Sequence, residues 1–445
     1  MPKRHVIVGG GTAGHNAITT IRQLEPRDEP SDLILVSAER PYSRMVLPYY
    51  LGRTIAESHV FTATPGRLAQ LGVKAHLGRR AVGLDARGGK LTLDDDTVLE
   101  YDDLLVATGS SAVKAPVPGA DGPGVHSFWT LEQARRVVAE VSAGSHVVMV
   151  GAGFIAFTIL NSILRLGARL TIIEIAPQIL PRMIDRDGAG LVEAWLRQHG
   201  VEVRTSATLK GIEQVGGKRR LSFEAGGPLD ADVVIMATGI RPNLEWLRGS
   251  GIPVNRGVLV DEHLRSSVPT VYAAGDVAEG RDLVTGHPDV HAIEPTAMEH
   301  GRVVGANMAG RAVSYRGSLL MNVVDVCELD VASFGRWDDP QAEVVAAVRP
   351  GRPAYRKLLW HGDRLTGAMI LGRAEDVWTT NDVGMLKGLV QTGVALGRWK
   401  ERLSRNPFEI KPAFIASRTT ARLLPETVLG RPSPSPAVVA STGRV

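Results

Sequence analysis

Short apolar runs alternate with glycine-rich turns and longer amphipathic stretches through most of the first 310 residues. Four runs are almost wholly aliphatic and end at turn residues, as buried strands do. These runs are residues 5–8, 33–36, 147–150 and 170–173. We expect each to form a strand of a parallel sheet, with helices packed against it.

One glycine pattern follows two of these strands. Residues 9–14 read Gly-x-Gly-x-x-Gly, and residues 151–156 repeat the pattern with alanine in the last position. Such a turn lets the backbone approach a pyrophosphate at the positive N-terminus of the next helix. A single copy also has purely structural uses, whereas two copies behind matching strands predict two dinucleotide sites.

An acidic residue follows the second strand of each unit, as a ribose-binding group requires. Glu174 stands 21 residues after Gly153, near the usual spacing of about 20. Glu39 lies further from its glycines, because residues 25–30 lengthen the first unit. Glu39 therefore has two interpretations, a ribose contact and a solvated side chain.

A third repeated element is an apolar strand that runs into Ala-Thr-Gly. It occurs at residues 105–109 and, with a similar strand, at residues 235–239. In both copies we expect the backbone after the strand to lie close to a bound nucleotide.

Composition sets bounds on this picture. The 445 residues are 44% hydrophobic, which is enough apolar material for two or three packed domains. The one cysteine, Cys327, excludes a disulfide framework and a cysteine-rich metal cluster within the chain, and we expect no metal site. The basic start is followed by a strand too short for a signal-peptide core, and no apolar run reaches the about 18 residues that span a bilayer. We expect a cytoplasmic protein that does not bind nucleic acid.

The motifs also carry a family resemblance. Residues 9–14, the two Ala-Thr-Gly segments, residues 238–243 and residues 271–276 occur in this order. Together they resemble the FAD- and pyridine-nucleotide-dependent oxidoreductases of the two-dinucleotide-domain superfamily, the pyridine nucleotide-disulfide oxidoreductase-like proteins. The resemblance is clear over residues 4–310 and weaker over residues 315–400. It implies an α/β fold of two Rossmann-like domains, with the NADH domain inserted in the FAD domain, and a C-terminal α+β interface domain.

In that superfamily the first glycine motif holds FAD and the second holds NADH or NADPH. The resemblance places Asp276 on the ribityl and phosphate region of FAD, and residues 294–297 at a helix N-terminus that faces the flavin. Glu174 would accept hydrogen bonds from a ribose 2′-hydroxyl and repel a 2′-phosphate, and Ile175 and Ala176 follow it in place of arginines. NADH is therefore expected rather than NADPH. The expected cofactor contacts are Gly9, Gly11, Thr12, Ala13, Gly14, Glu39, Arg44, Val82, Ala107, Thr108, Gly109, Gly151, Gly153, Phe154, Ile155, Glu174, Thr238, Gly239, Gly275, Asp276, Thr296 and Ala297.

Residues 41–52 separate the branches of the superfamily. Disulfide reductases have a cysteine pair against the flavin, peroxide- and persulfide-handling members have one cysteine in this segment, and this chain has none there. The segment is similar to that of ferredoxin, rubredoxin and nitrite reductase-type NADH flavoproteins, in which Pro-Tyr-x-Arg opens a loop over the isoalloxazine. Arg44 is carried over as a flavin or phosphate contact. Those relatives continue with Ser-Lys, where Pro48 and Tyr49 stand here.

Three residues are candidates for catalytic roles. Tyr49 replaces the lysine of those relatives and either stacks or hydrogen-bonds at the flavin or packs in a helix. Phe154 stands where relatives have an aromatic gate over the flavin, although it could equally belong to a helix core. Thr158 replaces a glutamate near the nicotinamide amide and can still form a hydrogen bond to that amide.

The motif order predicts a domain layout. We expect a discontinuous FAD-binding domain (residues 1–118 and 240–315), an NADH-binding domain (119–239), a C-terminal interface or dimerisation domain (316–405) and a basic, Pro/Ser-rich tail (406–445). The breaker-rich residues 115–124 support the first boundary. In the third domain the patterns predict strands near residues 344–348 and 355–360, and an amphipathic helix across residues 381–403.

The resemblance implies an FAD-dependent NADH:acceptor oxidoreductase that is not a dithiol/disulfide reductase. Hydride passes from NADH to FAD, and electrons then pass to a carrier protein of the ferredoxin, rubredoxin or nitrite reductase type. Basic residues between Arg398 and Arg422 could dock an acidic carrier, lie on a membrane surface or form a solvated face. A homodimer is expected from the resemblance. The alternatives are NADH:quinone or NADH oxidase activity, and a redox-sensing interaction protein with slow turnover.

Overall fold

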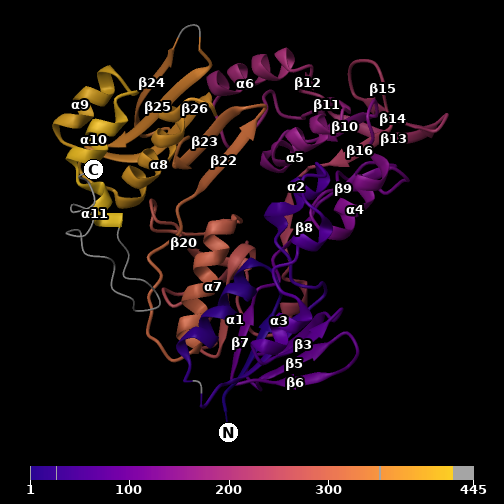
Figure 1. The fold of residues 1–445 in the computed structure, drawn as a ribbon, viewed down its shortest axis with the longest axis vertical. Helices are drawn as coiled ribbons and strands as arrows, with labels where there is room; N and C mark the ends of the chain where they lie inside the picture. Colours follow the sequence, from indigo (N-terminus) through magenta and orange to yellow (C-terminus); the bar gives the residue numbers. More distant parts are fainter. Residues whose placement is uncertain (1, 27, 350–351, 424–445) are drawn as a thin grey trace, which may run out of the picture.

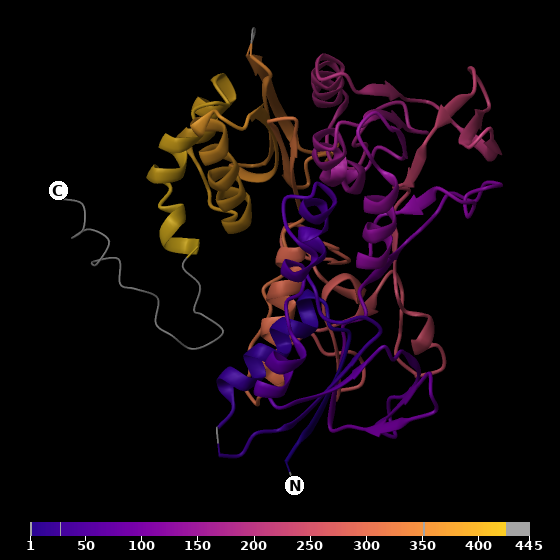
Figure 2. The same cartoon turned by 45° about the vertical axis from the view of Figure 1, so that its right-hand side comes forward.

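Three lobes, each built around its own sheet, make up the molecule (Figures 1 and 2). The computed structural model describes residues 2–26, 28–349 and 352–423. Two of the sheets are wholly parallel and the third is antiparallel. The architecture is therefore the predicted α/β fold with two Rossmann-like lobes and a C-terminal lobe.

The first lobe contains a parallel sheet of the order β19-β7-β1-β2-β3. Its strands form where the apolar runs predict them, because β1 and β2 are buried along nearly their whole length. Helices α1 and α7 cover one face, and an antiparallel sheet of β4, β5 and β6 covers the other. The bounds are β1 (Arg4–Val8), α1 (Thr12–Leu24), β2 (Asp32–Ser37), α3 (Pro65–Gln70), β3 (Val73–Leu77), β4 (Ala81–Asp85), β5 (Lys90–Leu93), β6 (Val98–Glu100), β7 (Asp103–Val106), β19 (Val271–Ala273) and α7 (Glu294–Met308).

Helices α1 and α7 pack closely through glycines. A Cβ atom added to Gly301 would lie 2.3 Å from the Ala13 carbonyl oxygen, and one added to Gly305 would lie 2.7 Å from the Ala17 carbonyl oxygen. Helix α7 begins at Glu294, so residues 294–297 form its first turn, at the helix N-terminus that the resemblance implies. The two helices lie side by side in Figure 1, on one face of the first sheet.

The second lobe repeats the plan with a parallel sheet of the order β12-β11-β10-β16-β9. Strand β10 is buried at all five positions, as its apolar run predicts. Helix α4 starts with a capping box between Thr130 and Gln133, and Asp185 caps helix α6. The bounds are β9 (Val125–Ser127), α4 (Leu131–Glu140), β10 (His146–Val150), α5 (Phe154–Arg165), β11 (Arg169–Ile173), α6 (Arg186–Gln198), β12 (Glu202–Arg204), β13 (Leu209–Val215), β14 (Lys218–Phe223), β15 (Leu229–Ala231) and β16 (Val233–Met236).

A two-stranded ribbon connects the two parallel-sheet lobes. Strands β8 (Ser110–Ala112) and β17 (Ile240–Pro242) pair antiparallel directly after the two Thr-Gly segments. The remaining short elements of the first lobe and its connections are η3 (Glu245–Leu247), β18 (Val258–Leu259), η4 (Gly275–Val277), β20 (Ala278–Arg281) and β21 (Pro288–Asp289). The chain thus passes into and out of the second lobe at one place.

Residues 41–61 leave the first lobe and pack on the second, which differs from the expected domain layout. The segment contains η1 (Arg44–Val46), α2 (Leu47–Leu51) and η2 (Glu57–His59), and α2 contacts α4 and α5. Four of its side chains, at positions 42, 47, 51 and 60, are buried in the core of the second lobe. Ser162 donates a hydrogen bond to the Pro48 carbonyl oxygen (2.7 Å), and Arg135 and Glu57 form an ion pair (2.6 Å). Figure 1 shows α2 beside α5 and β9 rather than beside α1.

The C-terminal lobe is an antiparallel sheet of the order β22-β23-β26-β25-β24, with helices on one face. The two predicted strands are confirmed as β24 and β25. The other face packs on α6, where Asp185 accepts hydrogen bonds from the Tyr355 hydroxyl (2.8 Å) and pairs with Lys357 (3.0 Å). The bounds are β22 (Met321–Val326), β23 (Leu329–Gly335), β24 (Glu343–Arg349), β25 (Ala354–His361), β26 (Arg364–Arg373), α8 (Val377–Thr392), α9 (Arg398–Arg405), α10 (Ile410–Ala416) and α11 (Thr419–Leu423).

Two expectations for this lobe were wrong. The helix expected across residues 381–403 is divided into α8 and α9, because residues 393–397 include two glycines with positive φ. Residues 410–423, expected in a tail, form α10 and α11, and Ile410 and Ala413 are fully buried against α8. The Pro/Ser-rich part of the expected tail lies outside the described residues. Among the described helices, none has the length and apolar character needed to cross a membrane.

Candidate functional site

A cavity of about 2000 Å³ is lined by both glycine motifs. Its walls come from the carboxyl ends of β1 and β10, from residues 39–48, from the start of α4 and α5, and from residues 320–323 of the C-terminal lobe. Ligands bind to open α/β sheets at this end of the strands. The volume exceeds the 300–1,000 Å³ that is typical of a single small-molecule site.

The first glycine loop has the geometry of a phosphate cradle. Gly9 has a positive φ of 116°, and an added Cβ atom would lie 2.0 Å from the Ala107 carbonyl oxygen. Nothing lies within 4 Å of a Cβ atom built on Gly11, so this position faces open space in the cavity. Gly11 is also the N-cap of α1 and makes no side-chain cap, which leaves the first amide groups of the helix free for an anion.

The second loop repeats these features. Gly151 has a φ of 100°, and its added Cβ atom would lie 2.5 Å from the Ala237 carbonyl oxygen. Gly153, the uncapped N-cap of α5, has nothing within 4 Å of its built Cβ atom. Ala156 is fully buried, which agrees with a packing role for the third position of the motif.

Both acidic candidates for ribose binding line the cavity. Glu174 is buried, and its two carboxylate oxygens accept hydrogen bonds from the backbone amides of Ala152 (2.6 Å) and Ala176 (2.9 Å). The carboxylate therefore fixes the second glycine loop while its remaining lone pairs stay available to a ligand. Glu39 accepts a hydrogen bond from the Tyr42 hydroxyl (3.1 Å), so its side chain is not freely solvated, and the ribose contact stays a prediction.

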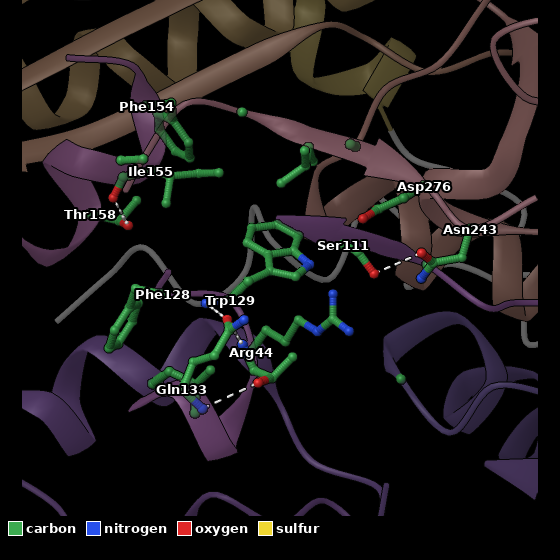
Figure 3. A pocket seen from close by; sticks show the side chains of 18 of the residues that line it. Arg44, Ser111, Phe128, Trp129, Gln133, Phe154, Ile155, Thr158, Asn243 and Asp276 are labelled. Carbon is green, nitrogen blue, oxygen red and sulfur yellow. Dashed lines mark hydrogen bonds between the residues drawn. The ribbon is translucent and has the colours of Figure 1, made fainter. Parts of the chain in front are cut away.

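Asp276 and Arg44 meet at a buried serine, Ser110. The Ser110 hydroxyl donates to Asp276 Oδ2 (2.5 Å), and the Ser110 carbonyl oxygen accepts from Arg44 Nη1 (3.0 Å). The same carbonyl oxygen accepts from the indole nitrogen of Trp129 (2.6 Å). Figure 3 shows Arg44, Trp129 and Asp276 around one part of the cavity.

Helix α7 points its N-terminus at the cavity, which Glu294, Pro295 and Ala297 line. Burial raises the pKa of Glu294, whose carboxylate accepts a hydrogen bond from the Thr12 hydroxyl (3.4 Å). Deeper in the same helix, burial lowers the pKa of His300 to about 3. Its Nδ1 atom accepts a hydrogen bond from the Gly275 amide (3.3 Å), beside Asp276.

Phe154 and Thr158 both line the cavity from the first turns of α5 (Figure 3). The Thr158 hydroxyl donates to the Ile155 carbonyl oxygen (2.7 Å), so in this arrangement its oxygen is left to a ligand as an acceptor. Phe154 is partly buried and packs against the core of the second lobe. Phe154 therefore both lines the cavity and packs against the core, and its role as a gate over the flavin stays a prediction.

Four predicted site residues do not line the cavity. Tyr49 is 59% exposed, because a helix turns about 100° per residue and Pro48 occupies the inward position on α2. Val82 is exposed, while its neighbour Ala81 lines the cavity, and a register shift in β4 occurs between Ala81 and Gly83. Gly14 and Thr296 lie behind the wall, since Gly14 packs against the Gly9 backbone and Thr296 is buried. The remaining expected contacts all line the cavity.

The cavity also contains residues that are not among the expected cofactor contacts. They come from the start of α4, from the ribbon and η3, and from the C-terminal lobe. The main ones are Phe128, Trp129, Gln133, Asn243, Trp246, Met321 and Val323. The Thr130–Gln133 capping box could have located the start of α4 and hence Trp129, but no local signal joins β22 to a nucleotide site.

Cys327 lies away from the cavity, in the turn between β22 and β23. Burial raises the pKa of its thiol to about 11, so the reactive thiolate is scarce at neutral pH. The described structure therefore offers no thiol to a ligand in the cavity.

Comparison with known proteins agrees with this geometry. The family model described as pyridine nucleotide-disulphide oxidoreductase matches residues 3–301. The epsilon subunit of NADH-dependent phenylglyoxylate dehydrogenase from Aromatoleum evansii is 28% identical over 411 residues, which cover 92% of this chain and 96% of the relative. A rubredoxin-NAD(+) reductase from Pseudomonas putida is 30% identical over 285 residues, covering 63% of this chain and 73% of the relative.

Solved structures show the same fold. A NAD-dependent persulfide reductase from A. fulgidus superposes with a TM-score of 0.81 at 26% identity, covering 94% of this chain and 83% of that one. The likeness extends over all three lobes, since 94% of the chain is included.

Proposed function

This chain belongs to the pyridine nucleotide-disulphide oxidoreductase family, and from that membership we propose an FAD-dependent NADH:acceptor oxidoreductase whose acceptor is an electron-carrier protein. One observation carries the proposal. Both glycine loops open into the same cavity, so two dinucleotides can meet there.

The residues at the first loop fit FAD. The open position at Gly11 and the free amides of α1 suit a pyrophosphate, and Glu39 supplies an acceptor for ribose hydroxyls. Asp276 keeps one carboxylate oxygen outside its hydrogen bond to Ser110. The positive N-terminus of the 15-residue helix α7 would stabilise negative charge on a ring placed against it.

The residues at the second loop fit NADH. Gly153 and α5 offer a second pyrophosphate site, and Glu174 is placed for a 2′-hydroxyl. Ile175, which follows it, is exposed and lines the cavity without a positive charge. A 2′-phosphate would meet a carboxylate with no arginine at the adjacent positions to compensate for it.

When both cofactors are bound, NADH supplies a hydride to FAD, and FAD supplies electrons singly or in pairs to an acceptor. The chain's own contribution is to hold the two binding sites in one place. Phe154, Ile155 and Met321 line the cavity with apolar surface and limit the access of water. The loop contacts of Glu174 fix the NADH-binding backbone before the ligand arrives.

A carrier protein is the acceptor class with the best support. One relative is a rubredoxin-NAD(+) reductase and another is a subunit of an NADH-dependent dehydrogenase. Sulfur chemistry at the flavin would need a thiol, and Cys327 lies in a turn outside the cavity with a raised pKa. An iron–sulfur or haem protein that takes one electron at a time suits the remaining chemistry.

The proposal extends to a homodimer formed through the C-terminal lobe. Among the residues that the structure describes, strand β24 pairs with β25 alone and forms an edge of the sheet, and Val344 and Val348 on it are about half exposed. Exposed apolar side chains on an edge strand favour association. Light scattering of the purified protein, compared with a Val344→Lys/Val348→Lys variant, would test this assembly.

Anaerobic stopped-flow spectroscopy tests the main proposal. We expect NADH to bleach the flavin absorption of the purified protein quickly and NADPH to do so slowly. Ferredoxin, rubredoxin and a haem protein are then offered as acceptors, beside a quinone and oxygen. Turnover that is fastest with oxygen or quinone would replace the carrier-protein proposal by an oxidase or quinone reductase. Slow bleaching by NADH itself would favour the redox-sensing alternative.

A further inference from the structure

Trp129 occupies the middle of the cavity, between the parts assigned to the two nucleotides. In Figure 3 its indole lies between Phe154, Ile155 and Thr158 on one side and Ser111, Asn243 and Asp276 on the other. It lies at the end of the loop before α4, near the ribbon that joins the two lobes. None of the sequence motifs described above includes this residue.

The indole is held rigidly. Its ring nitrogen donates to the Ser110 carbonyl oxygen (2.6 Å), and its backbone amide donates to the Gln133 side chain (2.8 Å). Gln133 in turn belongs to the capping box of α4. The polar edge of the indole is therefore satisfied by protein, which leaves apolar ring surface for a ligand.

The anchor of Trp129 is shared with two predicted flavin contacts. Ser110 is 1% exposed, and its carbonyl oxygen also accepts from Arg44 while its hydroxyl donates to Asp276. The Arg44 guanidinium lies 5.1 Å from the centroid of the indole ring. One buried residue thus fixes an indole, a guanidinium and a carboxylate relative to each other.

We propose that Trp129 is a positioning residue whose indole contacts the bound cofactor pair and aligns the nicotinamide with the flavin. This inference rests on the proposed function. An aromatic platform with two torsions offers a large contact area and little freedom, and hydride transfer demands close alignment. Loss of the platform slows hydride transfer more than it weakens NADH binding.

Two variants and one control test the role. Trp129→Phe keeps an aromatic ring but lacks the donor to Ser110, and Trp129→Leu removes the aromatic platform. Trp399→Phe is the matched control, because Trp399 lies on α9 and does not line the cavity. For each protein we would first remove the FAD and measure how far tryptophan emission is quenched when FAD is added back. We would then measure the rate of anaerobic flavin bleaching as a function of NADH concentration.

We expect FAD to quench the tryptophan emission of Trp129→Phe less than that of the wild type, and to quench the emission of Trp399→Phe as much as that of the wild type. The flavin of Trp129→Leu should bleach about tenfold to hundredfold more slowly at saturating NADH, which is the effect expected when the reacting groups are misplaced by about 1 Å. The apparent Kd for NADH should change by less than about threefold. Trp129→Phe should lie between this variant and the wild type.

Equal quenching in Trp129→Phe and Trp399→Phe would overturn the proposal. A bleaching rate of Trp129→Leu within about twofold of the wild-type rate would also overturn it, because a 1 Å misplacement of the nicotinamide would slow hydride transfer far more. If both Trp129 variants fail to retain FAD while the Trp399→Phe control retains it, Trp129 serves FAD binding. That result would overturn the proposal that Trp129 aligns the nicotinamide with the flavin. A wild-type protein that NADH does not bleach would refute the proposed function, whereas the quenching comparison would still decide whether Trp129 contacts FAD.

Discussion

Individual side chains set the choice of nicotinamide cofactor. Glu174 accepts hydrogen bonds from the Ala152 amide in the second glycine loop and from the Ala176 amide after β11, and Ile175 is exposed beside it. Replacing Glu174 with alanine and Ile175 with arginine removes a repelling charge and adds a phosphate partner. Charge-assisted hydrogen bonds contribute about 1.5–3 kcal/mol, so preference should shift toward NADPH by roughly tenfold to hundredfold.

The ratio of the bleaching rates with NADPH and NADH measures this shift. Glu174→Gln serves as the control, because it removes the charge and turns one end of the carboxylate into a donor that faces a backbone amide. That variant should weaken NADH binding without making the protein accept NADPH. An unchanged ratio in the double variant would contradict the assignment of Glu174.

A second prediction concerns His300 and the pH dependence of the free energy of unfolding. Its folded-state pKa of about 3 lies below the ordinary value of 6.5, so the unfolded chain binds one more proton between these values. The free energy of unfolding should therefore fall as the pH drops below 6.5, by roughly 1 kcal/mol for each pH unit from this residue. Chemical denaturation at several pH values measures the slope.

Two His300 variants separate the proton from the hydrogen bond. Both His300→Gln and His300→Leu should flatten the pH slope. His300→Gln keeps an acceptor for the Gly275 amide, whereas His300→Leu leaves that buried donor unpaired, at a cost of about 1–3 kcal/mol. FAD should therefore dissociate faster from His300→Leu than from His300→Gln, and equal rates would argue against a link between His300 and the turn at Asp276.

The next prediction concerns the close packing of helices α1 and α7. Helices α1 and α7 present their N-termini to the same cavity, and they approach closely at Gly301. Gly301→Ala would place a Cβ atom 2.3 Å from the Ala13 carbonyl oxygen and push the helices apart. Overpacking of this kind costs about 1–3 kcal/mol, and we expect weaker FAD retention together with a lower Tm. Gly384→Ala on α8, where nothing lies within 4 Å of the new atom, should leave both values unchanged or raise the Tm.

A buried ion pair attaches α8 to the C-terminal sheet. Arg356 is 2% exposed, its Nη2 atom lies 3.0 Å from Asp382 Oδ2, and Nη1 donates to the Leu371 carbonyl oxygen. Arg356→Met leaves the Asp382 carboxylate buried alone, which typically costs about 3–5 kcal/mol. Adding Asp382→Leu should recover much of that loss in thermal unfolding experiments, because the double variant removes the uncompensated charge. If the double variant unfolds at the temperature of Arg356→Met, the charge is not the cause.

The sequence predicts some of these elements better than others. Strands β1 and β10 are buried along nearly their whole length, so they appear as continuous apolar runs, and the glycine loops are fixed by local backbone geometry. The C-terminal helices α10 and α11 have only seven and five residues, too few for a periodic pattern to emerge. Tyr49 and Val82 show that a motif indicates a segment, whereas the direction of each side chain depends on the tertiary structure.

In the molecule as a whole, the cavity lies between hydrophobic cores that belong to different groups of elements. The first sheet has its own cores, while the second sheet shares one core with residues 41–61 and part of the C-terminal sheet. A dinucleotide in the cavity would contact both groups of elements. Removal of FAD should therefore lower the Tm clearly, by the linkage between binding and folding, and re-addition should restore it in proportion to the logarithm of FAD concentration. A Tm that is independent of FAD would contradict the placement of FAD at this cavity.

The packing of residues 41–61 on the second lobe limits how nucleotide-binding modules of this kind can be recombined. Tyr42 accepts a hydrogen bond from the Leu131 amide at the start of α4, and Leu47 and Leu51 are fully buried against the second lobe. A chimaera that exchanges only residues 119–239 would separate these partners and expose two core leucines. A transplantable cassette must therefore carry two pieces of chain that are distant in sequence, and a recombination library with its crossover between them should yield mostly insoluble protein.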